Sequence, residues 1–183
     1  MARGLKNNEL KAIFVPEEKQ EADRALIRSR DRTVKDLTVA KNRIKSFLKI
    51  YGITVPEEFT TGKWTIRFTK WLSQLSFTES SSKRSLQYYL QQANFLMTQR
   101  KQIEQEIQSL ATGPLYGHKV NLLTTIPSVG MLTAMTFLTE IGGISRFKNI
   151  DHLSSYCGLT PDCRNSGPDR THYWYDQTGK CYS

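Results

Sequence analysis

Residues 122–167 read LLTTIPSVGMLTAMTFLTEIGGISRFKNIDHLSSYCGLTPDCRNSG, and this stretch decides the fold expected for the chain. The turn IPSVG precedes an amphipathic segment, which predicts two helices joined by a hairpin. Pro127 is expected to end the first helix, and Gly130 to let the backbone turn tightly before the second. The first amide groups of that second helix lack intrahelical partners and suit a phosphate, so Ser128 and Gly130 are candidate nucleic-acid contacts.

The residues after this hairpin predict further short helices. Gly142 and Gly143 are expected to stop the second helix, because glycine favours helix ends. The segment 145–148 is a basic connector, and 150–156 can form another short helix before the glycine at 158. Residues 113–183 are therefore expected to form a small helical domain of the helix-hairpin-helix type.

Several short blocks in this region occur in a characteristic order: IPSVG, EIGGISRF, YCGLTP and RNSG. With these blocks the chain resembles the C-terminal transposase domain of the DEDD insertion-sequence transposases, the IS-110 family. The resemblance implies that residues 1–16, read as a helix, a turn and a short strand at 12–15, are the end of a RuvC-like α/β nuclease domain. It also implies a chain truncated at both ends, without the closing helices of the family.

The same resemblance implies a catalytic serine at Ser166, which would attack a DNA phosphate and hold it covalently. Arg164 and Arg170 would then neutralise phosphate charge. From the residues alone, Asn165-Ser166-Gly167 is more simply an ordinary turn. The family's four acidic residues match no position of this chain, so no metal ligand and no bound cofactor are predicted here, although Mg²⁺ is expected for the intact family.

Residues 17–112 predict a module of long helices. A helix should start at Pro16-Glu17-Glu18, because proline and acidic residues favour the first turn. Leu37, Ile44 and Tyr51 recur every seven residues, which indicates one long amphipathic helix to Tyr51.

The opposite face of this long helix is strongly basic. Nine Lys or Arg residues lie between Arg24 and Lys49, against only Asp31 and Asp36. A solvated face usually mixes charges, so this one favours contact with a nucleic-acid backbone. The predicted contacts on this helix are Arg28, Arg32, Lys35, Lys41, Arg43 and Lys45.

A second heptad pattern runs from Leu86 to Leu110 and predicts coiled-coil pairing. Its partner is either the basic helix or another subunit, so a homo-oligomer is expected without a choice between the two. Between the long helices, Trp64, Phe68 and Trp71 lie on the apolar side of a shorter helix. For these aromatic residues core packing is the preferred interpretation, ahead of base stacking.

Composition bounds the partners. The 183 residues carry a formal net charge of +9, so a polyanion is the leading partner and an anionic membrane surface the rival. We find no signal peptide and no membrane-spanning apolar run in the sequence, which favours the cytoplasm and no membrane partner. Cys157, Cys163 and Cys181 are an odd number without a CxxC pair, so neither a disulfide framework nor a standard zinc site is indicated.

Taken together, these patterns predict a mainly α fold: long antiparallel helices, then a helix-hairpin-helix-like domain, with a strand remnant at the N-terminus. The leading hypothesis is a DNA-binding transposase or recombinase fragment, inactive alone, with a structured guide RNA as a further candidate partner. The alternative is a non-enzymatic helix-hairpin-helix DNA-binding protein. A coiled-coil adaptor that binds an acidic protein ranks third.

Overall fold

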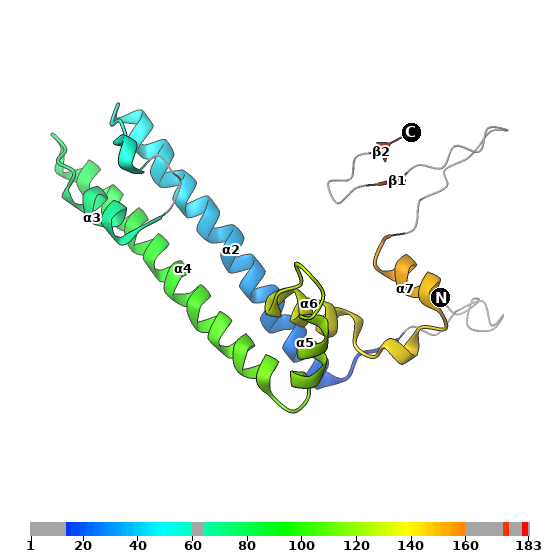
Figure 1. The fold of residues 1–183 in the computed structure, drawn as a ribbon. Coiled ribbons are helices and arrows are strands. Elements are labelled where there is room, and N and C mark those ends of the chain that lie inside the picture. Colours follow the sequence, from blue (N-terminus) through cyan, green and yellow to red (C-terminus); the bar gives the residue numbers. More distant parts are fainter. Residues whose placement is uncertain (1–13, 60–63, 160–173, 176–180, 183) are drawn as a thin grey trace, which may run out of the picture. The chain divides into compact units, whose positions relative to one another are not determined.

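The computed structural model describes residues 14–59 and 64–159, and the backbone of 174–175 and 181–182. The described part is mainly α, as predicted. The chain divides into two compact units, Met1–Glu140 and Ile141–Ser183. The helices in chain order are α2 (Glu18–Ile50), η1 (Glu57–Phe59), α3 (Ile66–Gln74), α4 (Ser80–Thr112), α5 (Gly117–Leu123), α6 (Met131–Ile141), η2 (Ile144–Arg146) and α7 (Ile150–Tyr156) (Figure 1).

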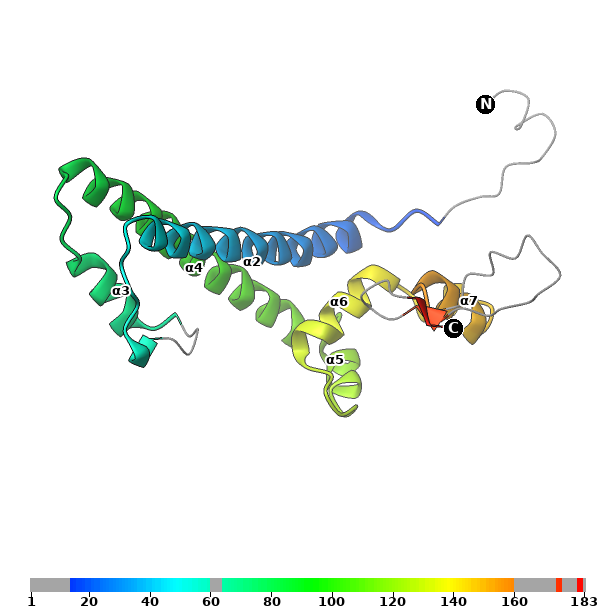
Figure 2. The same ribbon diagram turned by 90° about the horizontal axis from the view of Figure 1, so that it is seen from above.

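The two 33-residue helices α2 and α4 lie side by side and form the frame of the first unit (Figures 1 and 2). Leu37 and Ile44 of the predicted repeat on α2 are buried and pack in one cluster with Leu86 and Ala93 of α4, whereas Tyr51 is 47% exposed. The sequence left two partners possible for the second heptad helix, the basic helix or another subunit. In the structure α4 packs against the basic helix α2 of the same chain. Coiled-coil geometry and an oligomer formed through these helices stay predictions.

Helix ends follow the local sequence signals. Helix α2 begins after Glu17, with acidic residues in its first turn, and α4 ends at Thr112 before the Gly-Pro pair, both as predicted. Helix α6 ends at Ile141, and Gly142 follows with a φ of 72°, a left-handed conformation that glycine adopts without strain. The predicted stop at Gly142 is confirmed.

Aromatic side chains fill the end of the first unit that carries α3. Phe68 stacks on Trp71 with ring centroids 5.7 Å apart, and Trp64 meets Phe68 edge to face at 5.1 Å. Phe68 and Leu72 are buried in the same cluster as α2 and α4, and Trp64 and Trp71 pack against it. Core packing of both tryptophans is confirmed.

Helices α5 and α6 lie at the other end of the α2–α4 pair (Figure 2). A second buried cluster joins them to the long helices through Ile27, Ile107, Val120 and Met135. The first unit therefore includes α5 and α6, which sequence analysis places in the module that begins at residue 113.

The second unit contains η2, α7 and two short strands. Asn149 caps α7, because its side-chain oxygen accepts a hydrogen bond from the His152 amide at 3.0 Å. The Arg146 guanidinium lies 4.3 Å from the ring centroid of Phe147 and 4.4 Å from that of Tyr156, so the two rings hold this cation. Strands β1 (Trp174–Tyr175) and β2 (Cys181–Tyr182) pair antiparallel, an element that the sequence did not indicate.

The predicted N-terminal strand is not confirmed. Most of the segment 1–16 lies outside the described residues. Phe14 and Val15 belong to no strand and are 49% and 75% exposed, so the buried apolar run expected at 12–15 is absent over these two residues. Within the described residues, no helix combines the length and the apolar character that a membrane crossing requires.

Candidate nucleic-acid interface

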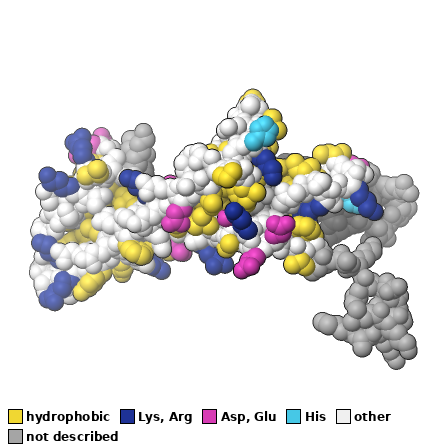
Figure 3. All heavy atoms as spheres, turned by 90° about the horizontal axis from the view of Figure 1, so that it is seen from below, with side chains coloured by type: hydrophobic (Ala, Val, Ile, Leu, Met, Phe, Trp, Pro, Cys, Tyr) yellow, Lys and Arg dark blue, Asp and Glu magenta, His cyan; other side chains and the backbone are white. Residues whose placement is uncertain are grey.

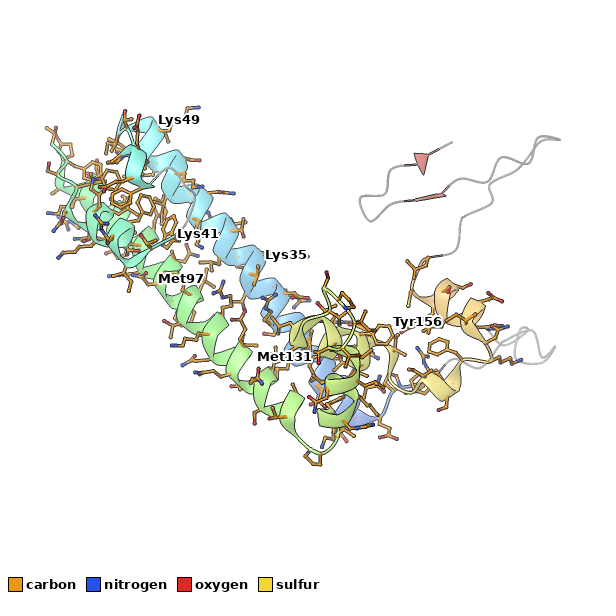
Figure 4. The ribbon with its side chains drawn as sticks, in the orientation of Figure 1. Lys35, Lys41, Lys49, Met97, Met131 and Tyr156 are labelled. Carbon is orange, nitrogen blue, oxygen red and sulfur yellow. The ribbon has the colours of Figure 1, made fainter. Side chains whose placement is uncertain are left out.

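A row of cations runs along the exposed side of α2. Arg28, Arg32, Lys35 and Arg43 share one face of the helix, since their spacing of four, three and eight residues follows the helical repeat. We call these four residues the basic stripe. Lys45 and Lys49 are exposed beside it, and Lys35 and Lys49 are labelled in Figure 4. Exposed cations therefore follow this side of α2, and their contact with a phosphate backbone stays a prediction.

Three of the nine cations counted on this helix pair with acidic residues of other helices. Arg24 and Arg28 pair with Glu140 of α6, at 3.4 Å and 2.8 Å. Arg30 pairs with Glu104 of α4 at 3.0 Å. The face that is strongly basic in the sequence is thus partly neutralised by acidic residues of other helices, which a count of charges along one helix could not reveal. Contact of Arg28 with nucleic acid stays a prediction.

Lys41 does not join the basic stripe. Its ammonium nitrogen lies 5.4 Å from the ring centroid of Trp64, on the side of α2 that faces α3 and α4 (Figure 4). Burial, together with the nearby charges of Arg100 and Lys45, lowers the pKa of Lys41 below its ordinary value. The structure therefore separates Lys41 from the other predicted phosphate contacts.

A buried polar network fixes α5 and α6 against the first turns of α2. The Tyr116 hydroxyl donates to Asp23 Oδ2 at 2.9 Å, and both side chains are buried. Gln20 and Arg24 donate to the Thr139 carbonyl at 2.9 Å and 3.1 Å. That carbonyl lies in the last turn of α6, where helices leave acceptors without intrahelical donors, so α2 caps the C-terminus of α6.

Sequence analysis missed this network, although a signal was present. Asp23 and Arg30 continue the heptad track of Leu37 and Ile44 toward the N-terminus, so charged residues occupy positions that are apolar further along. A charge on a buried track needs a partner. Here the partners are Tyr116 for Asp23 and Glu104 for Arg30.

The hairpin between α5 and α6 differs in detail from the expected turn. Helix α5 ends at Leu123, and further turns continue the chain to Pro127. The left-handed residue is Ser128, with a φ of 68°, whereas Gly130 lies outside that region. The tight turn therefore depends on Ser128, and its assignment to Gly130 was wrong.

Gly130 is nevertheless suited to a different role. A methyl group built on it would meet no atom within 4 Å, so the glycine leaves open space at the first turn of α6. Both Ser128 and Gly130 are exposed or partly exposed, and no side chain stands at Gly130. The space beside this helix start is therefore open, and binding of a phosphate there stays a prediction.

Other exposed cations escaped the sequence analysis because they are scattered rather than clustered. Lys83, Arg84 and Lys101 are exposed on α4, and Lys119 is exposed on α5, the first helix of the hairpin. Their only sequence signal is the excess of basic residues over acidic ones, which gives no positions.

The predicted catalytic residues lie outside the described part of the chain. This holds for Ser166, Arg164 and Arg170. Among the described residues, no group of three or more His, Cys, Asp or Glu side chains could hold a metal ion. The Mg²⁺ that the resemblance implies therefore has no ligand set in this part, and we assign no chemical step to it.

Comparison with known proteins agrees with the resemblance. Residues 120–175 match the model of the Transposase IS116/IS110/IS902 family, so the match begins in α5 and includes the hairpin, α6 and α7. No solved structure matches the chain.

Curated relatives extend the similarity beyond that region. The protein y4qE of Sinorhizobium fredii, named as a transposase, is 29% identical over 91% of this chain and 39% of its own length. The transposase for insertion sequence element IS1533 of Leptospira borgpetersenii is 31% identical over 73% of this chain and 38% of its own. The pilin gene-inverting protein of Moraxella bovis is 43% identical over 30% of this chain and 17% of its own. The chain thus spans about two fifths of the length of the first two relatives.

Proposed function

On the premise that residues 120–175 carry the sequence pattern of the Transposase IS116/IS110/IS902 family, we propose that this chain is the nucleic-acid-binding part of an insertion-sequence transposase or recombinase. Its partner is DNA. The observation that carries the proposal is the position of the family match, which falls on the hairpin with the open helix start at Gly130.

The charges of the first unit support a DNA partner. The exposed cations Arg32, Lys35, Arg43, Lys45 and Lys49 follow one another along a single helix. Such an array fits a polyanion with regularly spaced charges and contacts backbone rather than base edges. Binding through it is salt-dependent and tolerant of sequence.

We also propose the finer features that the family resemblance implies. Ser166 attacks a DNA phosphate, with Arg164 and Arg170 beside it. A structured guide RNA is a second polyanion for the same cations. A homo-oligomer forms through α2 and α4, an idea that the exposed apolar residues Val39 and Ile50 on α2 support.

Fluorescence anisotropy with a labelled DNA duplex tests the proposed contact surface. We expect log K to fall linearly with log salt, and a triple charge-removal variant to reduce the slope by about 0.9 for each phosphate that the chain no longer neutralises. The test variant combines Arg32→Gln, Lys35→Gln and Arg43→Gln. A control that removes the same charge from α4 combines Lys83→Gln, Arg84→Gln and Lys101→Gln. Equal effects of both variants would show that overall charge, not the stripe, drives binding.

A non-enzymatic DNA-binding protein remains the second candidate, because the described cations and the hairpin need no chemistry in order to bind. Strand-transfer assays with Mg²⁺ on the chain joined to the acidic N-terminal half of the family, in which Ser166→Ala is compared with Ser154→Ala, separate the two functions. The transposase proposal expects loss of a covalent protein–DNA adduct only with Ser166→Ala. Equal behaviour of the two variants favours the binding protein.

A further inference from the structure

A groove lies between α3 and α4, and its lining residues are not among the proposed contacts to the nucleic-acid backbone. Its volume is about 740 Å³. Its characteristic lining residues are Trp64, Lys70, Gln87, Gln91, Asn94 and Met97. We call it the amide groove; Met97 is labelled in Figure 4.

Two rows of hydrogen-bonding side chains face this space. Gln87, Gln91 and Asn94 follow each other on one face of α4, since they are spaced by four and three residues. All three are exposed, and none of their side chains forms a hydrogen bond within the described part of the chain. The opposite wall carries the hydroxyl groups of Thr65, which caps α3, and of Thr69 and Ser73 within it. The Thr69 and Ser73 hydroxyls donate to backbone carbonyls, and the Thr65 oxygen accepts from the Phe68 amide. The α4 wall therefore offers both donors and acceptors, whereas the hydroxyls of Thr69 and Ser73 offer only acceptors.

The groove also combines an aromatic residue with positive charge. Trp64 lines it, and its indole N–H is buried without an acceptor among the residues that the structure describes. Lys41 lies over the Trp64 ring, and Lys70 is part of the lining. No carboxylate occurs among the described lining residues. Figure 3 shows Lys and Arg side chains around hydrophobic ones at the end of the unit that carries α3.

We propose that the amide groove binds unpaired nucleotides of a nucleic-acid strand. Carboxamides match the donor and acceptor pairs on base edges, which a paired duplex presents only in its grooves. A cavity of this volume accepts a few exposed bases but not a double helix. The inference rests on the proposed function, since it takes nucleic acid as the partner.

In this assignment the first unit has two binding surfaces, which differ in whether the bases of the nucleic acid must be unpaired. The basic stripe contacts phosphates and is indifferent to pairing, whereas the amide groove contacts bases and requires them unpaired. Lys70 and Lys41 supply charge for phosphates next to the bound bases.

The test compares two double variants of α4 by fluorescence anisotropy. Gln91→Ala with Asn94→Ala removes two amides from the groove, and Gln102→Ala with Gln105→Ala removes two exposed amides elsewhere on the same helix. The probes are a labelled DNA single strand and an RNA single strand of about 12 nucleotides, and a duplex. Circular dichroism checks that each variant folds, and alanine favours the helix in all of them.

We expect the groove variant to weaken single-strand binding about tenfold and to leave duplex binding within about twofold. An effect on only RNA or only DNA supports the groove and identifies its strand. Single-strand binding that is unchanged, or weakened equally in the control variant, overturns the groove while the proposed function stands. If no probe binds the wild-type chain, the proposed function fails as well.

A second variant tests the indole group directly. Trp64→Phe keeps an aromatic ring against Phe68 and removes the N–H. The indole nitrogen is buried, so a base reaches its N–H only by displacing the groove wall, and a strand bound in that way should bind about fivefold more weakly to the variant. Unchanged single-strand affinity would remove Trp64 from the binding site.

Discussion

The two ends of the α2–α4 pair are held together by different forces. At the α3 end, aromatic rings pack closely: Phe47 lies 4.7 Å from Tyr51 and 5.7 Å from Phe77, measured between centroids. At the α5–α6 end, the apolar cluster is supplemented by Asp23, Arg24 and their partners, which form directional hydrogen bonds. Apolar packing tolerates small shifts, whereas hydrogen bonds weaken steeply when their geometry changes.

The difference indicates what each end has to do. In the proposed function the hairpin before α6 presents a helix start at a fixed position, and the bonds from α2 to the Thr139 carbonyl hold the opposite end of the same helix. The α3 end carries the amide groove, where walls that adapt to different bases are an advantage. Directional contacts are concentrated at the hairpin end, whereas at the α3 end the ring packing is accompanied by one such contact, between the Tyr51 and Ser82 hydroxyls at 2.9 Å.

The largest expected effect is the loss of packing at the α3 end. Leu72 is fully buried in the first core cluster, so Leu72→Ala should lower the free energy of unfolding by about 3 kcal/mol, since it removes buried apolar surface and leaves a cavity. Urea denaturation followed by circular dichroism measures it. Leu115→Ala is the control, since Leu115 is 46% exposed and should change stability by less than about 0.5 kcal/mol. Similar destabilisation in the two variants would contradict the packing described at this end.

A smaller effect is expected at the polar end. Tyr116→Phe keeps the ring and removes the hydroxyl, which leaves the buried Asp23 carboxylate without that donor. The expected destabilisation is about 2 kcal/mol, the usual cost of a buried polar group left unsatisfied. A double-mutant cycle with Asp23→Asn isolates the pair, because Tyr116→Phe should cost less once the carboxylate is gone. Additive effects would show that the two groups do not interact.

The same tyrosine gives this end a pH dependence. Burial and the hydrogen bond to Asp23 raise the pKa of Tyr116 well above its ordinary value of 10.0. The folded chain then holds the phenolic proton where the unfolded chain releases it, so this contribution is complete below pH 10 and declines as the pH rises further. Unfolding midpoints between about pH 9 and 11 should fall more steeply for wild type than for Tyr116→Phe. Parallel curves would contradict this.

The sequence predicts well what depends on local pattern. Leu37 and Ile44 show the apolar repeat of a long helix, Pro16 and Gly142 mark where helices begin and end, and both signals are read within a few residues. The sequence predicts poorly the contacts between residues that are far apart along the chain. Arg28 looks like a phosphate contact until Glu140, 112 positions later, is found beside it.

The candidate site shows the same limit. Lys41 carries the charge that backbone contact needs, but a neighbouring helix and Trp64 decide which way it faces. The amide groove could not be predicted from the sequence, because α3 and α4 contribute opposite walls and neither helix has an unusual sequence pattern. The left-handed conformation of Ser128 was not predicted for another reason: Gly130, two residues later, offered a simpler explanation of the same turn.

The smallest change in stability is expected for a variant at the hairpin. That variant should weaken DNA binding while it leaves folding almost unchanged. Gly130 has an ordinary φ and open space where a methyl group would stand, so Gly130→Ala should change the free energy of unfolding by less than about 0.5 kcal/mol. The added carbon would still obstruct a phosphate at the α6 start, so duplex affinity should fall about fivefold. Ser128→Gly is the matched control: it relieves a left-handed residue, so stability should rise by up to about 1 kcal/mol without that decrease in affinity. Full affinity in Gly130→Ala would mean that this helix start does not bind phosphate, and that the directional contacts at this end serve stability alone.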